Sequence, residues 1–211
     1  MKLALISLCV FTLLIFQQIL FAQQTQQWQQ ISNDAGIQVY TINMPNTDIV
    51  KAKAITEIKS NLIEIRQELD DIDSRHEWVP FLKQSKLIIV DSATKRLEYS
   101  LFSAPWPASN RDFVYSLELM QESSNQLVYK MRSVKTNIMP ENKKLIRGEI
   151  FESIYTLTKV NENLTRVELS YHADPKGWLP SWIVNIIQRI FPYKILNNLR
   201  TRMEQGHQMG L

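Results

Sequence analysis

The side chains that most often carry catalysis are sparse in this chain of 211 residues. It has three histidines, His76, His172 and His207, and no two of them have the spacing of metal ligands. The adjacent carboxylates Asp70 and Asp71 fall at the polar end of an expected helix, where they are most simply solvated. The five glycines form no phosphate-binding loop, and no serine lies in a nucleophile-elbow context. The sequence therefore predicts no catalytic residue, no metal site and no cofactor.

Binding an apolar ligand requires much less chemistry, and residues 104–114 point to it. They read Ala-Pro-Trp-Pro-Ala-Ser-Asn-Arg-Asp-Phe-Val. Pro105 and Pro107 fix φ and lack an N–H donor, so no central strand can pass through them. They hold Trp106 on a rigid loop. A closed cavity needs only a few such polar and aromatic groups among apolar walls.

Arg111 opens an expected strand whose apolar residues share its parity. Those residues are Phe113, Tyr115, Leu117 and Leu119. A charge at the start of a buried face, beside a rigid aromatic loop, indicates the rim of a cavity. The alternative is a proline-capped strand start, with Trp106 in the core and Arg111 extending outward to solvent.

The elements that must position these residues are mostly strands. Strands are expected at 37–42 and 49–58, then a helix near 62–72 capped by Ser60 or Asn61, then a shorter helical or turn-rich piece at 73–83. Five or six strands follow, at 85–91, 96–103, 112–120, 127–135, 145–158 and 164–173. Their short polar links indicate an antiparallel meander.

A long helix is expected at the C-terminal end, from about Leu179 to Met203. Its apolar face would include Trp182, Ile186, Ile190, Leu196 and Leu199. Pro192 should kink or break this helix and let its last turns loosen. Since no other long helix is available, this face should cover the cavity. The elements together predict an α+β domain with one helix laid across a curved antiparallel sheet.

Three stretches of the chain, in order, resemble the START (steroidogenic-acute-regulatory-related lipid transfer) domain family. Residues 105–114 resemble its signature loop and strand, 139–147 its second long loop, and 174–185 the turn that opens its C-terminal helix. The resemblance covers residues 28–205. It implies the helix-grip fold, a curved antiparallel sheet that grips a long C-terminal helix around an internal cavity, with a lipid in that cavity.

The resemblance also implies a position for an internal acid. Family members that bind sterols can carry an acid on the strand before the Pro-Trp-Pro loop and a basic residue on the strand after it. Here these positions fall on Glu98 and Leu117, so the pair is incomplete. That disfavours a sterol and favours a phospholipid or another amphiphile.

The alternation of the strand gives Glu98 the opposite orientation. Leu97, Tyr99 and Leu101 form its apolar face, which points Glu98 outward to solvent. The same alternation places Arg96 outside. A buried Glu98 would need a cationic partner, because a lone buried carboxylate is costly. Arg111 and Arg147 are the candidates.

Residues 1–22 have the features of a secretory signal peptide. Lys2 supplies the positive end, and residues 3–16 form an apolar run of 14 residues, short for a bilayer span. Cleavage is expected after Ala22, which also removes the single cysteine, Cys9. Residues 23–27 are a polar joint, 28–205 the lipid-binding domain and 206–211 a tail. The protein is expected to be secreted or periplasmic, or anchored to a membrane if the segment is kept.

The formal charge of +3 is spread along the chain without a basic stripe, so no nucleic-acid partner is expected. The sequence predicts a protein that binds one lipid and transfers it between membranes, touching them transiently. Its expected ligand-binding residues are Glu98, Trp106, Arg111, Phe113, Tyr115, Leu117, Arg147, Trp182, Ile186 and Ile190. The alternatives are a helix-grip enzyme of the cyclase or aromatase type, and a ligand-sensing or partner-binding module.

Overall fold

The structure is a computed structural model that describes residues 27–209, and the side chains of residues 27–206. The expected signal peptide lies outside these residues. The strands are β1 Gln29–Asp34, β2 Ile37–Ile42, β3 Lys51–Ile58, β4 Leu82–Ser92, β5 Lys95–Phe102, β6 Arg111–Glu122, β7 Gln126–Ser133, β8 Ile146–Arg147, β9 Glu149–Asn161 and β10 Leu164–Asp174. The helices are α2 Leu62–Asp70, the 3₁₀ turn η1 Ser74–Glu77, and α3 Ser181–Met209.

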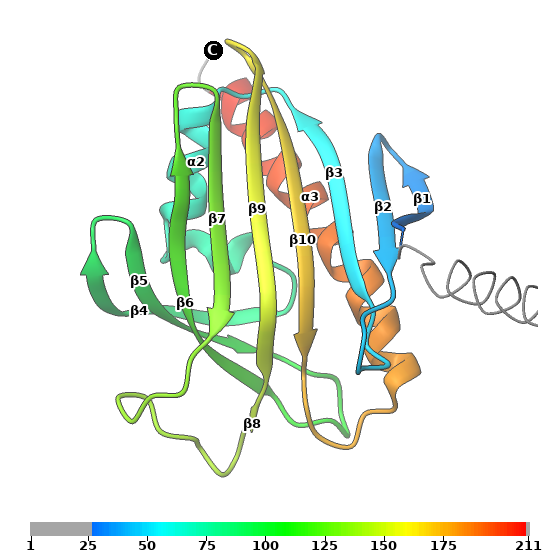
Figure 1. Ribbon diagram of the computed structural model, residues 1–211. Coiled ribbons are helices and arrows are strands. Elements are labelled where there is room, and N and C mark those ends of the chain that lie inside the picture. The colour runs from blue at the N-terminus through cyan, green and yellow to red at the C-terminus, as the bar shows by residue number, and fades with distance from the viewer. Residues whose placement is uncertain (1–26, 210–211) are drawn as a thin grey trace, which may run out of the picture.

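All the long strands belong to one antiparallel sheet. Their order is β1-β2-β3-β10-β9-β7-β6-β5-β4, and the short β8 pairs in parallel with β6. The expected meander is confirmed for β4 to β7 and for β9 to β10, in which strands that follow one another in the chain pair with one another. The pairing of β3 with β10 is not part of this meander. It places the N-terminal strands β1 to β3 beside the last strand of the chain. Figure 1 shows this strongly twisted sheet with α3 behind it.

The helix α2 begins as its sequence indicates. The Asn61 side chain accepts a hydrogen bond from the Glu64 backbone N–H at 2.9 Å, and the Glu64 carboxylate accepts one from the Asn61 N–H. This capping box fixes where the chain turns from β3 into α2. Ile65 and Leu69 then face the core, four residues apart on one side of the helix.

One strand was missed by the sequence prediction. The residues of β1, Gln29–Asp34, are all exposed, so they show no alternation of apolar and polar side chains. β1 pairs only with β2 and forms an edge of the sheet. Backbone pairing alone defines it, which hydropathy cannot reveal.

The core lies between the concave face of the sheet and the helices α2 and α3. The second half of α3 contributes Ile195, Leu196, Leu199 and Met203, which pack with Ile37 and Val39 of β2 and the buried residues of the central strands. α3 continues through Pro192 as one helix, so Pro192 does not break it, and the other expected effect, a kink, stays a prediction. In residues 27–209 no helix is both long enough and apolar enough to cross a bilayer.

Three long connections lie at one end of the sheet, which we call the loop end. They are residues 103–110 between β5 and β6, 134–145 between β7 and β8, and 175–180 between β10 and α3. Figure 1 shows them together at the bottom of the view. They include part of each of the three stretches that carry the family resemblance.

Candidate functional site

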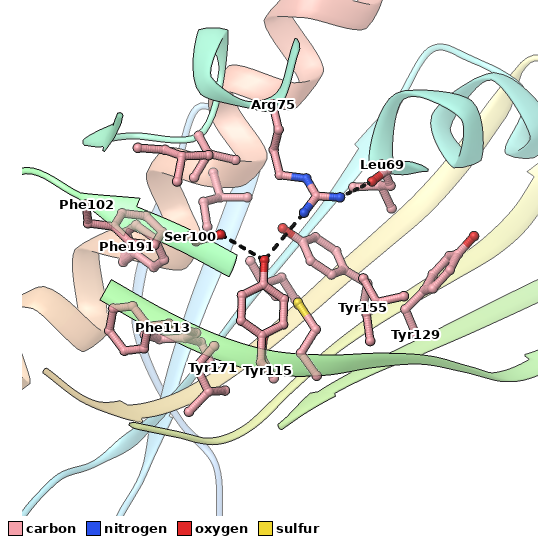
Figure 2. Close-up of a pocket in the computed structure, with 18 of the residues that line it drawn as sticks. Leu69, Arg75, Ser100, Phe102, Phe113, Tyr115, Tyr129, Tyr155, Tyr171 and Phe191 are labelled. Atoms are coloured by element: carbon pink, nitrogen blue, oxygen red, sulfur yellow. Dashed lines mark hydrogen bonds between the residues drawn. The ribbon is translucent and has the colours of Figure 1, made fainter. Parts of the chain in front are cut away.

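An apolar cavity of about 80 Å³ lies between the sheet and the helices. Its walls come from the end of α2, from η1 and the residues after it, from six strands and from α3. They include Leu69, Arg75, Trp78, Val79, Leu82, Ser100, Phe102, Phe113, Tyr115, Leu117, Tyr129, Met131, Ile150, Ser153, Tyr155, Leu169, Tyr171, Phe191 and Ile195. Figure 2 shows the aromatic side chains converging on this space, with Arg75 and Ser100 reaching the Tyr115 hydroxyl. Phe113, Tyr115 and Leu117 line it as the alternation of their strand predicts.

The polar edge of the cavity is built on Glu98, which is completely buried. Its carboxylate accepts hydrogen bonds from Arg75 Nη1 at 2.5 Å, from Arg96 Nε at 2.5 Å and from the Tyr115 hydroxyl at 3.0 Å. The Tyr115 oxygen also lies 2.9 Å from Ser100 Oγ. Glu98 thus lies behind the cavity wall and holds in place the groups that form it.

The register of β5 against β6 corrects the predicted orientation of Glu98. Glu98 lies directly opposite Tyr115, and Ser100 lies opposite Phe113. Directly paired residues project from the same face of a sheet, so the face of β5 with even-numbered residues points inward. The apolar alternation suggested the reverse, because Tyr99 on the other face is also buried. In such a doubly buried strand, hydropathy does not distinguish the two faces.

The cationic partners of Glu98 are also different from those expected. Arg96, which the sequence analysis places outside, lies directly opposite Leu117 and bonds Glu98. It therefore supplies the positive charge that Leu117 lacks. Arg111 and Arg147, the expected partners, do not form an ion pair with Glu98.

Arg75 is the functional candidate that sequence reasoning missed. It lies in η1, outside the sheet, and its Nη2 donates to the carbonyl of Leu69 at the end of α2, at 2.8 Å. The sequence does contain a signal for Arg75. Trp78 and Val79 follow it at i+3 and i+4, so in a helical turn all three side chains lie on the same side. All three line the cavity.

The charges of this cluster are balanced. Burial by itself raises the pKa of Glu98, but the charges and hydrogen bonds of Arg75 and Arg96 outweigh it and hold that pKa below its ordinary value. Burial, followed by the nearby Glu98 carboxylate, raises the pKa of Tyr115. The hydroxyl is therefore neutral at physiological pH and remains a hydrogen-bond donor.

A second carboxylate extends the network to the surface. Arg96 Nη1 donates to Asp70 Oδ1 at 2.9 Å, and the Tyr129 hydroxyl donates to Asp70 Oδ2 at 3.2 Å. Burial and the Asp70 charge raise the pKa of Tyr129 to about 12. The end of α2 is thereby fastened to β5 and β7.

Arg147 has a structural partner of its own. Its Nε and Nη2 each lie 3.0 Å from an oxygen of Asp112, a bidentate ion pair in which Asp112 is buried. The pair joins β8 to the start of β6 on the face away from the cavity. Arg147 therefore does not line the cavity, contrary to the placement predicted for it.

Arg111 is buried, with 5% of its surface exposed, at the loop end of β6. One guanidinium nitrogen, Nη1, donates to the Ser109 carbonyl oxygen. The backbone of the 175–180 connection packs against it, since a Cβ placed on Gly177 would lie 3.7 Å from Arg111 Nη2 and 2.9 Å from Ile146 Cδ1. Gly177, at φ +81°, is the residue type that permits this approach. The inward orientation predicted for Arg111 is confirmed, although its side chain does not line the cavity.

Four of the predicted residues are exposed. Trp106 is 92% exposed and Trp182 is 65% exposed, and Ile186 and Ile190 are each nearly half exposed. The face of α3 that reaches the cavity carries Phe191 and Ile195 instead. Gln188, on the inner face, is buried and donates to the Ala173 carbonyl oxygen. Because the first half of α3 is apolar on both sides, its period could not show which side faces inward.

Neither of the two histidines whose side chains are described lies at the cavity. His172 Nε2 lies 3.2 Å from the Ile49 carbonyl oxygen, and His76 Nδ1 lies 2.7 Å from that of Asp73. Within residues 27–206, no three His, Cys, Asp or Glu side chains gather closely enough to hold a metal ion.

Comparison with known proteins identifies the fold family. Residues 18–206 match the START domain. The rat phosphatidylcholine transfer protein is 24% identical over 162 residues, which are 75% of each chain. The crystal structure of a STAR-related lipid transfer protein from Xanthomonas axonopodis is 26% identical with a TM-score of 0.74, covering 84% of this chain and 98% of that one.

Human STARD10 has a similar fold at lower identity. It superposes with a TM-score of 0.76 at 21% identity, covering 87% of this chain and 78% of its own. The sheet of ten strands around a long C-terminal helix is the same helix-grip arrangement. On the match of residues 18–206 and on this architecture, the chain belongs to the START domain family.

Proposed function

We propose that this protein binds one amphiphilic lipid in the cavity and transfers it between membranes. The observation that carries the proposal is the aromatic-lined, mainly apolar cavity between the sheet and the helices. Lipid transfer by the related phosphatidylcholine transfer protein supports it. A pocket of this kind needs no catalytic group, because burial of apolar surface drives binding at about 25 cal/mol per Å².

The cavity must widen to accept such a ligand. Its volume of about 80 Å³ is small beside the ~300–1,000 Å³ typical of small-molecule pockets. Moving α3 away from the sheet enlarges it without breaking a strand pairing. Phe191 of α3 contacts Phe102 and Tyr171 with ring centroids 5.8 and 5.0 Å apart, so this aromatic cluster separates when α3 moves.

The polar edge suits an uncharged polar group of the ligand. Because Glu98 balances Arg75, this edge presents the neutral hydroxyls of Ser100 and Tyr115 and an already paired guanidinium. The Asp70 carboxylate, which also lines the cavity, is paired with Arg96. A hydroxyl or an ester carbonyl can bond there without adding charge to a buried network. Ligand orientation would follow from this contact.

The loop end is the surface we assign to transient membrane contact. Trp106 lies on the 103–110 connection, Trp178 on the 175–180 connection and Trp182 in the first turn of α3, and all three are mostly exposed. Tryptophan prefers the boundary between water and lipid.

The experiment that tests the function combines identification of the bound lipid with a measurement of lipid transfer. Protein purified from its own compartment is examined by native mass spectrometry for a bound lipid, and pyrene-labelled phosphatidylcholine is followed between donor and acceptor vesicles. One lipid per chain and accelerated transfer support the proposal. A bound lipid that is chemically changed would support the cyclase-type enzyme, and binding without transfer would support the ligand-sensing module.

We also propose that the protein is secreted or periplasmic. Lys2, the apolar run at 3–16 and Ala22 support a signal peptide. The mature chain should then begin at Gln23. Intact-mass measurement of protein recovered outside the cytoplasm checks this, and a mass that includes residues 1–22 would contradict it.

A further inference from the structure

Arg111 is a buried cation whose hydrogen-bonding capacity is largely unused. Nη1 donates to the Ser109 carbonyl oxygen, whereas Nε and Nη2 are inaccessible to solvent and have no hydrogen-bond partner. Nε and Nη2 are the adjacent nitrogens whose N–H bonds run parallel. This pair forms the fork that grips two oxygens of a carboxylate or phosphate.

No carboxylate in the described residues forms an ion pair with Arg111. Other arginines differ, since the buried Arg75 and the partly buried Arg96 pair with Glu98, and the partly buried Arg147 pairs with Asp112. Burial therefore lowers the pKa of Arg111, with no opposing charge to offset it. An unpaired buried charge lowers the free energy of unfolding. The presence of Arg111 therefore indicates a role other than stabilising the fold.

The position of Arg111 suggests that use. It shares a face of β6 with Phe113 and Tyr115, which line the cavity, and lies about 7 Å along the strand from Phe113. It is covered by Ile146 of β8 and by the backbone at Gly177. Two of the three loop-end connections thus touch Arg111, through Ser109 and Gly177.

We propose that Arg111 receives the anionic head group, a phosphate or a carboxylate, of the bound lipid, an inference that rests on the proposed lipid-binding function. Nε and Nη2 donate hydrogen bonds to two anionic oxygens when the 175–180 connection moves. The acyl chains then extend inward past Phe113 toward the Ser100 and Tyr115 hydroxyls. The paired Arg75 cluster takes uncharged groups, and the unpaired Arg111 takes the charge.

The test compares probes that share acyl chains and differ in head group. Pyrene-labelled phosphatidylcholine, diacylglycerol and fatty acid are titrated into the full chain, its Arg111→Met variant and an exposed control, Arg166→Met. Arg111→Met should weaken binding of the phosphatidylcholine or the fatty acid by about 10-fold or more, as expected for a lost charged hydrogen-bond pair. Diacylglycerol binding should change less than about two-fold, and Arg166→Met should match the wild type.

The pattern of losses separates the sources of the anion. A loss confined to phosphatidylcholine assigns a phosphate, and a loss confined to the fatty acid assigns a carboxylate. Millimolar inorganic phosphate should not displace either probe. Displacement by free phosphate would overturn the assignment to a lipid head group.

Thermal unfolding separates binding from a structural role. Because Arg111→Met removes an uncompensated buried charge, its melting temperature should equal or exceed that of the wild type. An equal loss of all three probes with a lower melting temperature would make Arg111 structural and overturn the inference. If Arg111→Met binds every probe as the wild type does, the assignment of Arg111 to the head group is overturned. The proposed lipid binding would then still stand. If the wild type binds none of them, the proposed function itself fails, and this inference fails with it.

Discussion

Glu98 and Arg111 represent two different ways of burying a charge in one small domain. Glu98 is surrounded by two guanidinium groups and a tyrosine hydroxyl, so its carboxylate is fully satisfied. Among the side chains of residues 27–206, Arg111 has one backbone carbonyl oxygen as its hydrogen-bond partner and no counter-ion. The first arrangement stabilises the wall of the cavity, and the second leaves a binding capacity available. Substitutions at the two residues should therefore have opposite effects on stability.

Replacing Glu98 by Gln should be strongly destabilising. Arg75 would lose its only ion-pair partner in a buried site, at a cost of about 3–5 kcal/mol for a broken buried pair. Urea denaturation followed by circular dichroism measures the free energy of unfolding. The matched control is Glu168→Gln, whose partially exposed pair with Lys53 spans 3.8 Å and should contribute no more than about 1 kcal/mol. Equal losses in the two variants would contradict the role assigned to Glu98.

The Glu98 carboxylate should also make the free energy of unfolding depend on pH. The pKa of Glu98 is held below its ordinary value, so its contribution is fully present above the unfolded pKa of about 4.3 and is lost as pH falls through the lower folded value. The difference in unfolding free energy between wild type and Glu98→Gln should thus be constant above about pH 5 and shrink below about pH 4. Denaturation at a series of pH values measures it. A difference that grows in acid would contradict the sign of this shift.

The helix α3 combines two halves with different surroundings. Beyond Pro192, its residues Leu196, Leu199 and Met203 are part of the main core. Before Pro192, the helix exposes Trp182, Ile186 and Ile190. Pro192 supplies no N–H to the preceding turn, so the two halves are weakly coupled there. The last turns, which the sequence suggested would loosen, are the better-packed half, and we assign the opening movement to residues 181–191.

A crosslink at the first half of α3 should therefore stop exchange of the ligand. Asn185 Oδ1 accepts a hydrogen bond from the Val50 N–H at 3.0 Å, and Asn185 Nδ2 donates to the Asp48 carbonyl at 2.9 Å. Val50→Cys combined with Asn185→Cys joins the helix to the start of β3 at this contact. Oxidised protein should keep its circular dichroism spectrum and transfer pyrene-labelled phosphatidylcholine at least about 10-fold more slowly, as expected when local opening is blocked.

Reduction of the crosslink is the internal control. The same protein with a reducing agent should regain most of its transfer rate, because the two cysteines alone leave α3 free to move. Normal transfer by the oxidised form would show that the opening lies elsewhere, and the 134–145 connection would be the next candidate.

The molecule as a whole presents its exposed tryptophans at one end. Trp106, Trp178 and Trp182 lie on or beside the loop-end connections, and the net charge of +3 is too small for electrostatics alone to hold the protein on a membrane. Apolar and interfacial contact should therefore dominate attachment. It should be brief, because few side chains take part.

Removing these side chains should reduce membrane binding without harming the fold. Trp106→Ala combined with Trp178→Ala should lower partitioning onto phosphatidylcholine vesicles by roughly 10-fold or more, since each mostly exposed ring contributes area only on the membrane. Vesicle co-sedimentation measures this. Val90→Ala removes an exposed apolar side chain on β4, away from the loop end, and should leave partitioning unchanged. Equal partitioning of the two variants would show that the membrane-contact surface is not the loop end.

Much of the architecture could be predicted from the sequence because it depends on local periodicity. The alternation at Phe113, Tyr115 and Leu117 predicted a strand and its inner face, and the structure confirms both. Short polar links predicted antiparallel neighbours. Ser60 or Asn61 was the predicted cap of α2, and the structure has Asn61; the stretches at 105–114, 139–147 and 174–185 indicated the family. Each of these signals lies within a few residues along the chain.

The tertiary structure alone decided which face of each ambiguous element points inward. β5 is buried on both sides and the first half of α3 is apolar on both sides, so periodicity gave Glu98, Trp182 and Ile186 the wrong orientations. The partners of Glu98 come from a turn 23 residues earlier in the chain and from β5 itself. Burial of a charge is favourable only with its partners in place. Those partners are brought together by strand register and helix docking, which depend on contacts between distant segments and leave no trace in local hydropathy.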